Sequence, residues 1–181
     1  MRTCKTIKKP FRPNCFRVIM LDFKKLFVLA KPYLEKNDLG SAHTSRVLAI
    51  ARNNFPIPKD IEELTISSII LHDIGGSSIK EQYEKGPGIA RSVLREMSCD
   101  ENFIGKVCQI VGTHHDHPDE PSAAFRILYD SDKIVMFSPE EFPIYNSRPK
   151  FDWDKIVGLI YTEQGKKMAR EMLKQRLNEQ N

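Results

Sequence analysis

The segment DIEELTISSIILHDIGG, residues 60–76, decides the fold that we expect for this chain. Its apolar residues recur with helical spacing, Asp60 is placed to cap the helix, and Gly75 and Gly76 end it. The side chains expected to face the core are Ile61, Leu64, Ile66, Ile69, Ile70 and Leu71. Such a helix carries His72 and Asp73 at its end. Adjacent residues on a helix point about 100° apart, so the two side chains can straddle one ion.

The rest of the chain repeats this helical pattern, and strand-like alternation is weak throughout. Upstream, we predict a helix capped by Asp22 and a second one capped by Ser41. Downstream, the predicted helix starts and caps are Pro87, Asp100, Pro121, Asp152 and Thr162. Residues 138–151 are rich in proline and polar residues and are predicted to form a loop. The sequence therefore indicates an all-α fold, a single-domain bundle of roughly seven or eight helices.

Composition limits the class of protein further. The chain has 181 residues, which is enough for one domain with a real core, and 40% of them are hydrophobic. The net charge of +4 permits anion binding, but no aromatic and basic ribbon indicates specific nucleic-acid binding. The four cysteines form no CxxC pair, so we expect reduced thiols and a cytoplasmic protein.

The first residues differ from the rest of the sequence. Residues 1–19 are basic, contain Pro10 and Pro13 and show no periodicity, so we interpret them as a flexible basic N-terminal arm. The domain itself is predicted at residues 20–181. The apolar run at residues 16–30 is interrupted by Asp22, Lys24 and Lys25, which argues against a signal peptide. No run of about 18 apolar residues is present, so no membrane partner is expected.

Histidine and aspartate residues are concentrated near the predicted helix ends. They comprise His43, the pair His72-Asp73, the cluster THHDHPDE at residues 113–120, and two aspartates in ILYDSDKI at residues 127–134. Each one alone has an ordinary role as a cap, a turn residue or a solvated side chain. Together, imidazoles and carboxylates suit a divalent ion such as Mn, Fe, Co, Ni, Zn or Mg. Such a set leaves positions open for water and a phosphate oxygen.

The ordered set resembles the signature of the HD-domain superfamily, which is H…HD…D on a helical bundle. The matching segments are SAHTSRVLAIA (41–51), SIILHDIGG (68–76) and ILYDSDKI (127–134). The stretches at residues 85–97 and 104–118 are also similar to a bacterial and archaeal subgroup of these hydrolases. The resemblance implies a divalent metal held by His43, His72, Asp73 and Asp132.

The resemblance favours Asp132 over Asp130 as the last ligand. The family ligand commonly precedes a basic residue, which here is Lys133. Asp130 is expected to lie directly behind the ligands.

The sequence leaves open whether a second metal ion binds. His114 and His115 resemble the histidine pair of two-metal HD proteins in the cyclic-dinucleotide phosphodiesterase group. Here no GYP follows the pair, and Gly76 stands where that group places a lysine. Lys85-Gly86 occupies the region where a further histidine is expected. One ion is therefore predicted, with His114 and His115 left to bind a second ion, a substrate phosphate or solvent, and His117 is expected on the surface.

The resemblance implies hydrolysis of a small phosphate ester, with a nucleotide as the expected substrate and a metal-activated water as the nucleophile. Asp73 is predicted to hold the ion and orient the water, and Arg46 or Lys133 to stabilise the phosphoryl charge. The predicted substrate contacts are His114, His115, Gln82 and Lys80. Further cations in reach of the predicted site are Lys85 and Arg91.

Two other functions stay open, a non-catalytic metal or nucleotide sensor and an HD-type di-iron oxygenase. The oxygenase needs about six ligands, and the missing histidine argues against it. The closing segment spaces Met168, Met172 and Leu173 as a helix would, and this apolar face could be core or the seam of a homodimer.

Overall fold

The computed structural model describes residues 21–179, so the predicted arm at residues 1–19 lies outside the described part. Within residues 21–179 the chain forms nine α-helices and no strand, which confirms the predicted all-α class. The helices are α1 (Phe23–Leu34), α2 (Gly40–Asn54), α3 (Lys59–Leu71), α4 (Ile79–Glu96), α5 (Glu101–Thr113), α6 (Ala123–Val135), α7 (Phe142–Asn146), α8 (Trp153–Leu159) and α9 (Glu163–Asn178).

Helix α3, which carries the segment quoted first, lies at the centre of the fold. It packs against α1, α2, α5 and α6, and every residue from Thr65 to Leu71 is buried. This part of α3 can be buried on all sides because it carries only apolar residues and the small Thr65, Ser67 and Ser68. Ile69 packs into one hydrophobic cluster with α2, α6, α8 and α9, whereas Ile66 and Ile70 pack into a second one with α1, α4 and α5.

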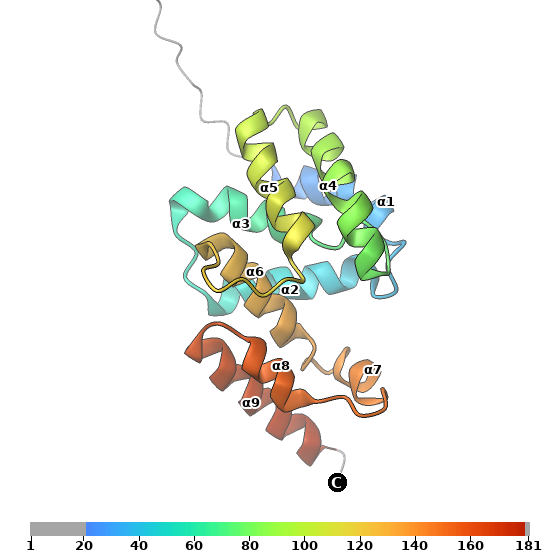
Figure 1. The fold of residues 1–181 in the computed structure, drawn as a ribbon, viewed down its shortest axis with the longest axis vertical. Helices are drawn as coiled ribbons and strands as arrows, with labels where there is room; N and C mark the ends of the chain where they lie inside the picture. Colours follow the sequence, from blue (N-terminus) through green and yellow to red (C-terminus); the bar gives the residue numbers. More distant parts are fainter. Residues whose placement is uncertain (1–20, 180–181) are drawn as a thin grey trace, which may run out of the picture.

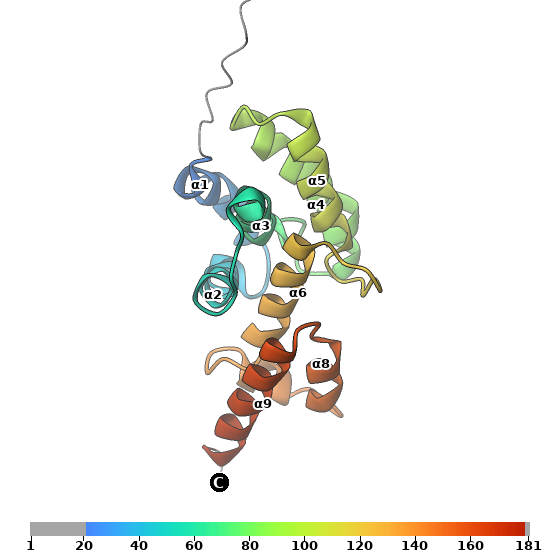
Figure 2. The ribbon, with the colours of Figure 1, turned by 90° about the vertical axis from the view of Figure 1, so that its left-hand side faces the viewer.

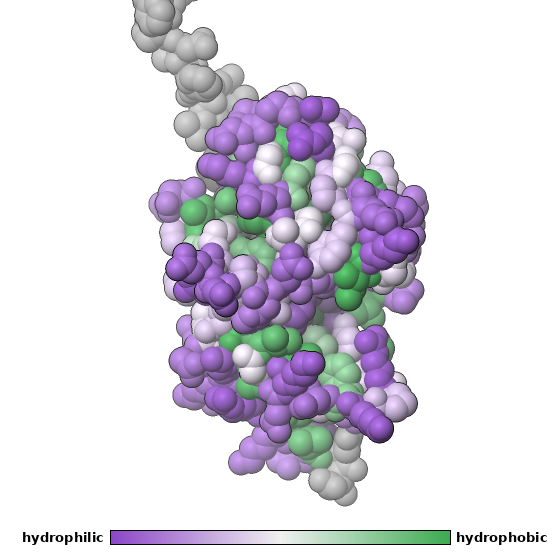
Figure 3. Space-filling model, in the orientation of Figure 1, coloured by the Kyte–Doolittle hydropathy of each residue, from purple (hydrophilic) through white to green (hydrophobic). Residues whose placement is uncertain are grey.

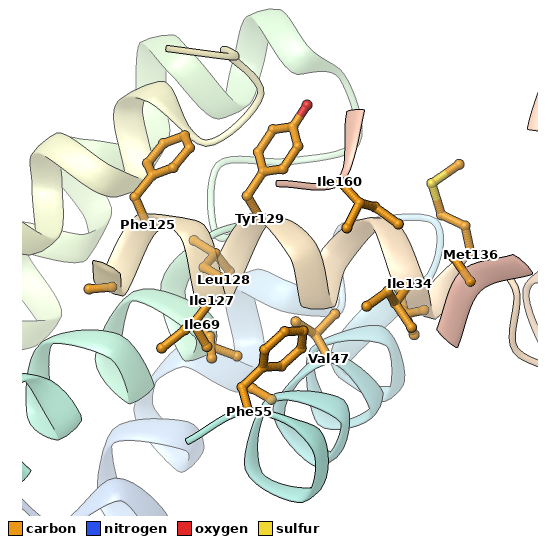
Figure 4. Close-up of a cluster of buried hydrophobic side chains, with 14 of the residues drawn as sticks. Val47, Phe55, Ile69, Phe125, Ile127, Leu128, Tyr129, Ile134, Met136 and Ile160 are labelled. Atoms are coloured by element: carbon orange, nitrogen blue, oxygen red, sulfur yellow. The ribbon is translucent and has the colours of Figure 1, made fainter. Parts of the chain in front are cut away.

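Helix α6 links two parts of the molecule. Figures 1 and 2 show α1 to α6 gathered at one end, with α7, α8 and α9 packed at the other end of α6. In Figure 4, Leu128 of α6 lies close to Ile69 of α3 and Val47 of α2, and Ile160 lies near the other end of the same helix. This packing holds the last turns of α6 beside α2 and the end of α3.

Most of the predicted caps are confirmed. The Asp22 side chain accepts hydrogen bonds from two backbone N–H groups at the start of α1, and Asp100, Asp152 and Thr162 each accept one at α5, α8 and α9. Each cap satisfies N–H groups that have no partner inside their helix. Three predicted starts are shifted by one or two residues. Helix α2 begins at Gly40, α3 begins at Lys59 so that Asp60 lies inside it, and α6 is capped by Ser122.

Two predictions of local structure were wrong. Pro87 does not start a helix but lies inside α4, which begins eight residues earlier at Ile79. The cause is the N-cap at Ser78, which has the S-x-x-E order of a capping box: its hydroxyl accepts a hydrogen bond from the Glu81 backbone N–H at 3.2 Å and donates one to the Glu81 carboxylate at 3.1 Å. The predicted loop at residues 138–151 contains α7, whose five residues are too few for periodicity to reveal.

Hydrophilic residues cover most of the face shown in Figure 3, with apolar residues visible between them. The exposed large hydrophobic side chains in residues 21–179 are Val28, Ile79, Ile144 and Leu177. No helix in this range combines the length and the apolar character that crossing a bilayer requires. Met168, Met172 and Leu173 pack partly buried against the core, in agreement with the core interpretation of the closing helix.

Candidate metal centre

Three helices bring four of the predicted ligands together. His43 lies in the first turn of α2, His72 caps the end of α3 with Asp73 after it, and Asp132 lies in the last turn of α6. The Nε2 atom of His43 is 3.2 Å from His72 Nε2 and 3.2 Å from Asp132 Oδ1. Asp73 Oδ2 lies 3.6 Å from both Nε2 atoms. The predicted set His43, His72, Asp73 and Asp132 therefore converges on one point.

Hydrogen bonds on the far side of each imidazole fix its ligand atom. His72 Nδ1 lies 2.8 Å from the carbonyl of Ile69, which can only accept, so Nδ1 carries the proton. His43 Nδ1 lies 3.0 and 3.2 Å from the two carboxylate oxygens of Glu141. In the neutral ring the lone pair is then on Nε2, which faces the cluster in both residues. This arrangement is typical of metal-binding histidines.

The electrostatics of the cluster favour a bound cation. Burial disfavours the charged form of His43, but hydrogen bonds with Asp132 and Glu141 outweigh it and raise its pKa to about 10. Burial also acts against ionised Asp73, and the charges of His72 and His114 nevertheless hold the pKa of Asp73 well below its usual range. The ligand atoms of His43, His72 and Asp73 lie within 4.8 Å of one another, and Asp132 Oδ1 lies 3.2 Å and 3.7 Å from the two Nε2 atoms. This donor set fits a divalent ion of the predicted kinds.

A second group of donors shares Asp73. His114 Nε2 lies 3.4 Å from Asp73 Oδ1, the oxygen that does not face His43 and His72. His114 Nδ1 is held at 2.8 Å from the carbonyl of Val111, and its buried Nε2 has no hydrogen-bond partner. His115 belongs to the same group, and burial followed by the charge of His114 lowers its pKa to about 4. The two oxygens of Asp73 therefore serve two adjacent clusters of ligand atoms.

The two aspartates of α6 have different surroundings. Asp132 faces the histidines, as predicted. Asp130 does not lie behind the ligands as expected, because it accepts hydrogen bonds from Tyr161 N at 2.7 Å, Thr162 N at 3.0 Å and Thr162 Oγ1 at 2.7 Å. Asp130 thus holds the junction between α8 and α9, and Asp132 remains the ligand candidate.

Glu141 is a functional residue that the sequence analysis missed. It is fully buried at the start of α7, where it contacts His43 and accepts hydrogen bonds from Arg46 Nε at 2.9 Å and Nη2 at 2.6 Å. Arg46 is one turn after His43 on α2, but its guanidinium is bound to Glu141 and does not line the pocket. The geometry gives Arg46 a positioning role through Glu141, in place of the predicted contact with phosphate.

The cluster forms the floor of a cavity of about 260 Å³. Its lining residues are Asn37, Asp38, Leu39, His43, Asp73, Ser77, Ile79, Gln82, His115, Asp132, Lys133, Met136, Tyr145 and Arg148. Gln82 lines the cavity because α4 packs tightly on the turn after His72 and Asp73. A Cβ atom on Gly75 in that turn would lie 2.5 Å from Gln82 Cα. Lys133 Nζ donates to Asp132 Oδ2 at 2.8 Å, and Asp132 raises the pKa of Lys133 although burial opposes it.

Of the other residues that the sequence analysis singled out, Gln82 lies at the cavity, whereas Lys80 and His117 lie outside it. Gln82 Oε1 contacts His115 Nε2 at the edge of the cavity. Lys80 does not line the cavity: its side chain is 81% exposed and pairs with Glu84 on the outer face of α4. His117 is exposed, as expected, and stacks on the ring of Tyr161 with 4.4 Å between the centroids.

Comparison with known proteins bears on the family. Residues 40–136 match the family model of the HD domain, whereas comparison with curated proteins and with solved structures gave no match. The matched range covers more than half of the chain and includes His43, the His72-Asp73 pair and Asp132. Because the family match and the convergence of these four residues agree, the chain belongs to the HD-domain family.

Proposed function

We propose that this chain is a divalent-metal-dependent phosphohydrolase that acts on a small phosphate ester of nucleotide size. The observation that carries the proposal is the convergence of two Nε2 atoms and two carboxylates on the floor of one cavity, with both Nδ1 atoms already engaged. A divalent ion bound there would lower the pKa of a bound water and supply a nucleophile at neutral pH.

The residues of the chain have distinct parts in this proposal. His43, His72, Asp73 and Asp132 hold the ion. Glu141 and the Ile69 carbonyl keep the imidazoles in the orientation that directs Nε2 inward. Lys133 holds Oδ2 of Asp132 and leaves Oδ1 for the ligand cluster, and its charge at the cavity wall favours the extra negative charge of a phosphoryl transition state.

The size of the cavity supports a small substrate. At about 260 Å³ it is below the roughly 300–1,000 Å³ that is typical of drug-sized ligand pockets. Leu39, Ile79 and Met136 give it an apolar part beside the charged floor. A compact organic phosphate such as a nucleoside monophosphate suits this combination better than a bare polyphosphate chain does.

A specific observation favours a second ion. His114 Nε2 is buried without a hydrogen-bond partner and faces Asp73 Oδ1, so it lacks only a cation to bind. We propose that Asp73, His114 and His115 hold this ion. Metal analysis should then find two ions for each wild-type chain and one for His114→Ala.

The main experiment combines metal analysis with a phosphatase screen in Mn²⁺, Co²⁺, Ni²⁺ or Mg²⁺. We expect bound divalent metal and hydrolysis of nucleoside monophosphates, with the hydrolysis lost in both His72→Ala and Asp73→Ala. His72→Ala should lose the ion of the first cluster, whereas Asp73→Ala should lose both ions, because Asp73 belongs to both clusters. His117→Ala is the matched control, because His117 lies outside the cavity, and it should retain metal and activity. A metal-loaded protein that hydrolyses no phosphate ester would support a sensor, and two irons with oxygen uptake would support an oxygenase. Either result would refute the phosphohydrolase.

A further inference from the structure

One wall of the cavity comes from a segment outside the family match. The match ends at residue 136, whereas Tyr145 of α7 and Arg148 in the turn after it both line the cavity with the ligand cluster. Neither residue has a part in holding the ion. The segment therefore adds to the cavity something that the shared domain does not supply.

The two cations that line the cavity, Lys133 and Arg148, differ in whether an acidic side chain already pairs with them. Lys133 is bound to Asp132 at 2.8 Å. Within residues 21–179, by contrast, no carboxylate lies within 4.0 Å of the Arg148 guanidinium, and its close contact is the ring of Tyr145. A guanidinium presents a planar fork of donors that matches the oxygens of a phosphate group. Among the described residues, Arg148 is thus the cation of the cavity wall that has no acidic partner.

Aromatic neighbours hold the Arg148 guanidinium in place before any ligand binds. The guanidinium carbon lies 4.6 Å from the centroid of the Tyr145 ring, within the range of a cation–π contact. The Tyr145 ring packs against Phe151, with 5.7 Å between centroids. Helix α7 is fixed in turn by Phe142, which stacks on Trp153 at 4.6 Å. A side chain that is already held near its binding position loses less conformational entropy when a ligand binds.

We propose that Arg148 binds the phosphate group of the substrate at the cavity wall and is the specificity-determining cation of this site. The assignment of its ligand as a phosphate ester rests on the proposed function. The aromatic support and the missing acid partner make Arg148 an anion-binding group. Because it lines the same cavity as Asp73 and Asp132, it would hold the anion near the ion that these residues would bind. Lys133 remains committed to Asp132.

The test measures binding of inorganic phosphate to the Mn²⁺-loaded protein by isothermal titration calorimetry, which needs no turnover. In Arg148→Ala the dissociation constant for phosphate should rise roughly 10- to 100-fold, the range expected for hydrogen bonds to a charged group. Arg148→Lys keeps the charge but loses the fork, and should fall between the two. Arg170→Ala removes an exposed arginine of α9 that lies outside the cavity, and it should bind phosphate as the wild type does.

Folding and metal loading are checked separately, because Arg148 is exposed and contacts no ligand residue. All variants should keep the wild-type urea midpoint and Mn²⁺ content. If Arg148→Ala binds phosphate within twofold of the wild type, or if the wild type binds no phosphate, the assignment is overturned. Phosphate binding that depends on Arg148, in a protein that hydrolyses no ester, would uphold the assignment and refute the proposed function. With an active protein, Arg148→Ala should raise KM about tenfold and change kcat less.

Discussion

Replacing Glu141 with alanine is expected to weaken metal binding although Glu141 is not itself a ligand. Its carboxylate accepts from His43 Nδ1 at 3.0 and 3.2 Å, and without it this nitrogen loses the group that fixes the tautomer and orientation of the ring. Loss of such a partner typically costs 10- to 100-fold in metal affinity. The dissociation constant for Mn²⁺ should rise by this factor, which corresponds to about 1.4–2.7 kcal/mol.

The same substitution should lower the stability of the metal-free protein. Glu141 is fully buried and Arg46, which donates to it at 2.6 and 2.9 Å, is 26% exposed. Removing one partner of a buried ion pair costs about 3–5 kcal/mol, and the lower end of that range applies because water reaches the guanidinium. We therefore expect the free energy of unfolding of Glu141→Ala to fall by about 3 kcal/mol.

Calorimetry with Mn²⁺ measures the affinity, and urea unfolding in the presence of a chelator measures the stability. Glu141→Gln keeps an acceptor oxygen for His43 and should retain more affinity than Glu141→Ala. Glu140→Ala, at the exposed neighbouring position, should change neither quantity. If folded Glu141→Ala binds Mn²⁺ within twofold of the wild type, Glu141 does not position His43 for the metal.

Asp130→Asn should lower the free energy of unfolding by about 1–3 kcal/mol, because one of its two acceptor oxygens is lost. Its Mn²⁺ affinity should be unchanged, whereas Asp132→Asn should weaken binding of the ion at His43 and His72 in the same calorimetric assay. The metal-free protein should lose stability as the pH rises from about 6.5 to 10. The folded state holds a proton on His43 up to a pKa of about 10, above the ordinary 6.5, so this stabilisation is complete below pH 6.5 and is lost progressively as the pH rises to about 10. Urea unfolding at several pH values that gave a flat profile would contradict this. Gly75→Ala should destabilise the protein by about 1–3 kcal/mol, since the new Cβ would meet the backbone of α4. Gly158→Ala, where nothing lies within 4 Å, should not reduce the urea midpoint.

The sequence revealed those parts of the site that depend on local pattern. His72 and Asp73 follow a long apolar helix, and a helix that ends at two glycines places their side chains together. The caps at Asp22 and Asp100 could also be predicted, because each one depends on residues only two or three positions away. A capping box at Ser78 and Glu81 was equally local, and its recognition would have placed the start of α4 correctly.

The wall formed by α7 had no comparable signal. Glu141 lies 98 residues from His43 in the sequence, in a segment with two nearby prolines and no periodicity. Charged residues in such segments are usually solvated, so neither the burial of Glu141 nor the place of Arg148 could be inferred from residue type. The position of Glu141 depends on its contacts with His43 and Arg46, which lie more than 90 residues away in the sequence.

Asp130 and Asp132 show why residue type alone could not separate a ligand from a structural residue. Both are aspartates of one helical segment and lie in the interior of the fold, so the sequence signals at the two positions are nearly the same. Two positions along a helix correspond to a rotation of about 200°, so the side chains leave α6 in nearly opposite directions. One reaches the histidines of α2 and α3, and the other reaches the backbone at the start of α9. A single turn of α6 therefore carries both a candidate metal ligand and the residue that holds the last two helices in place.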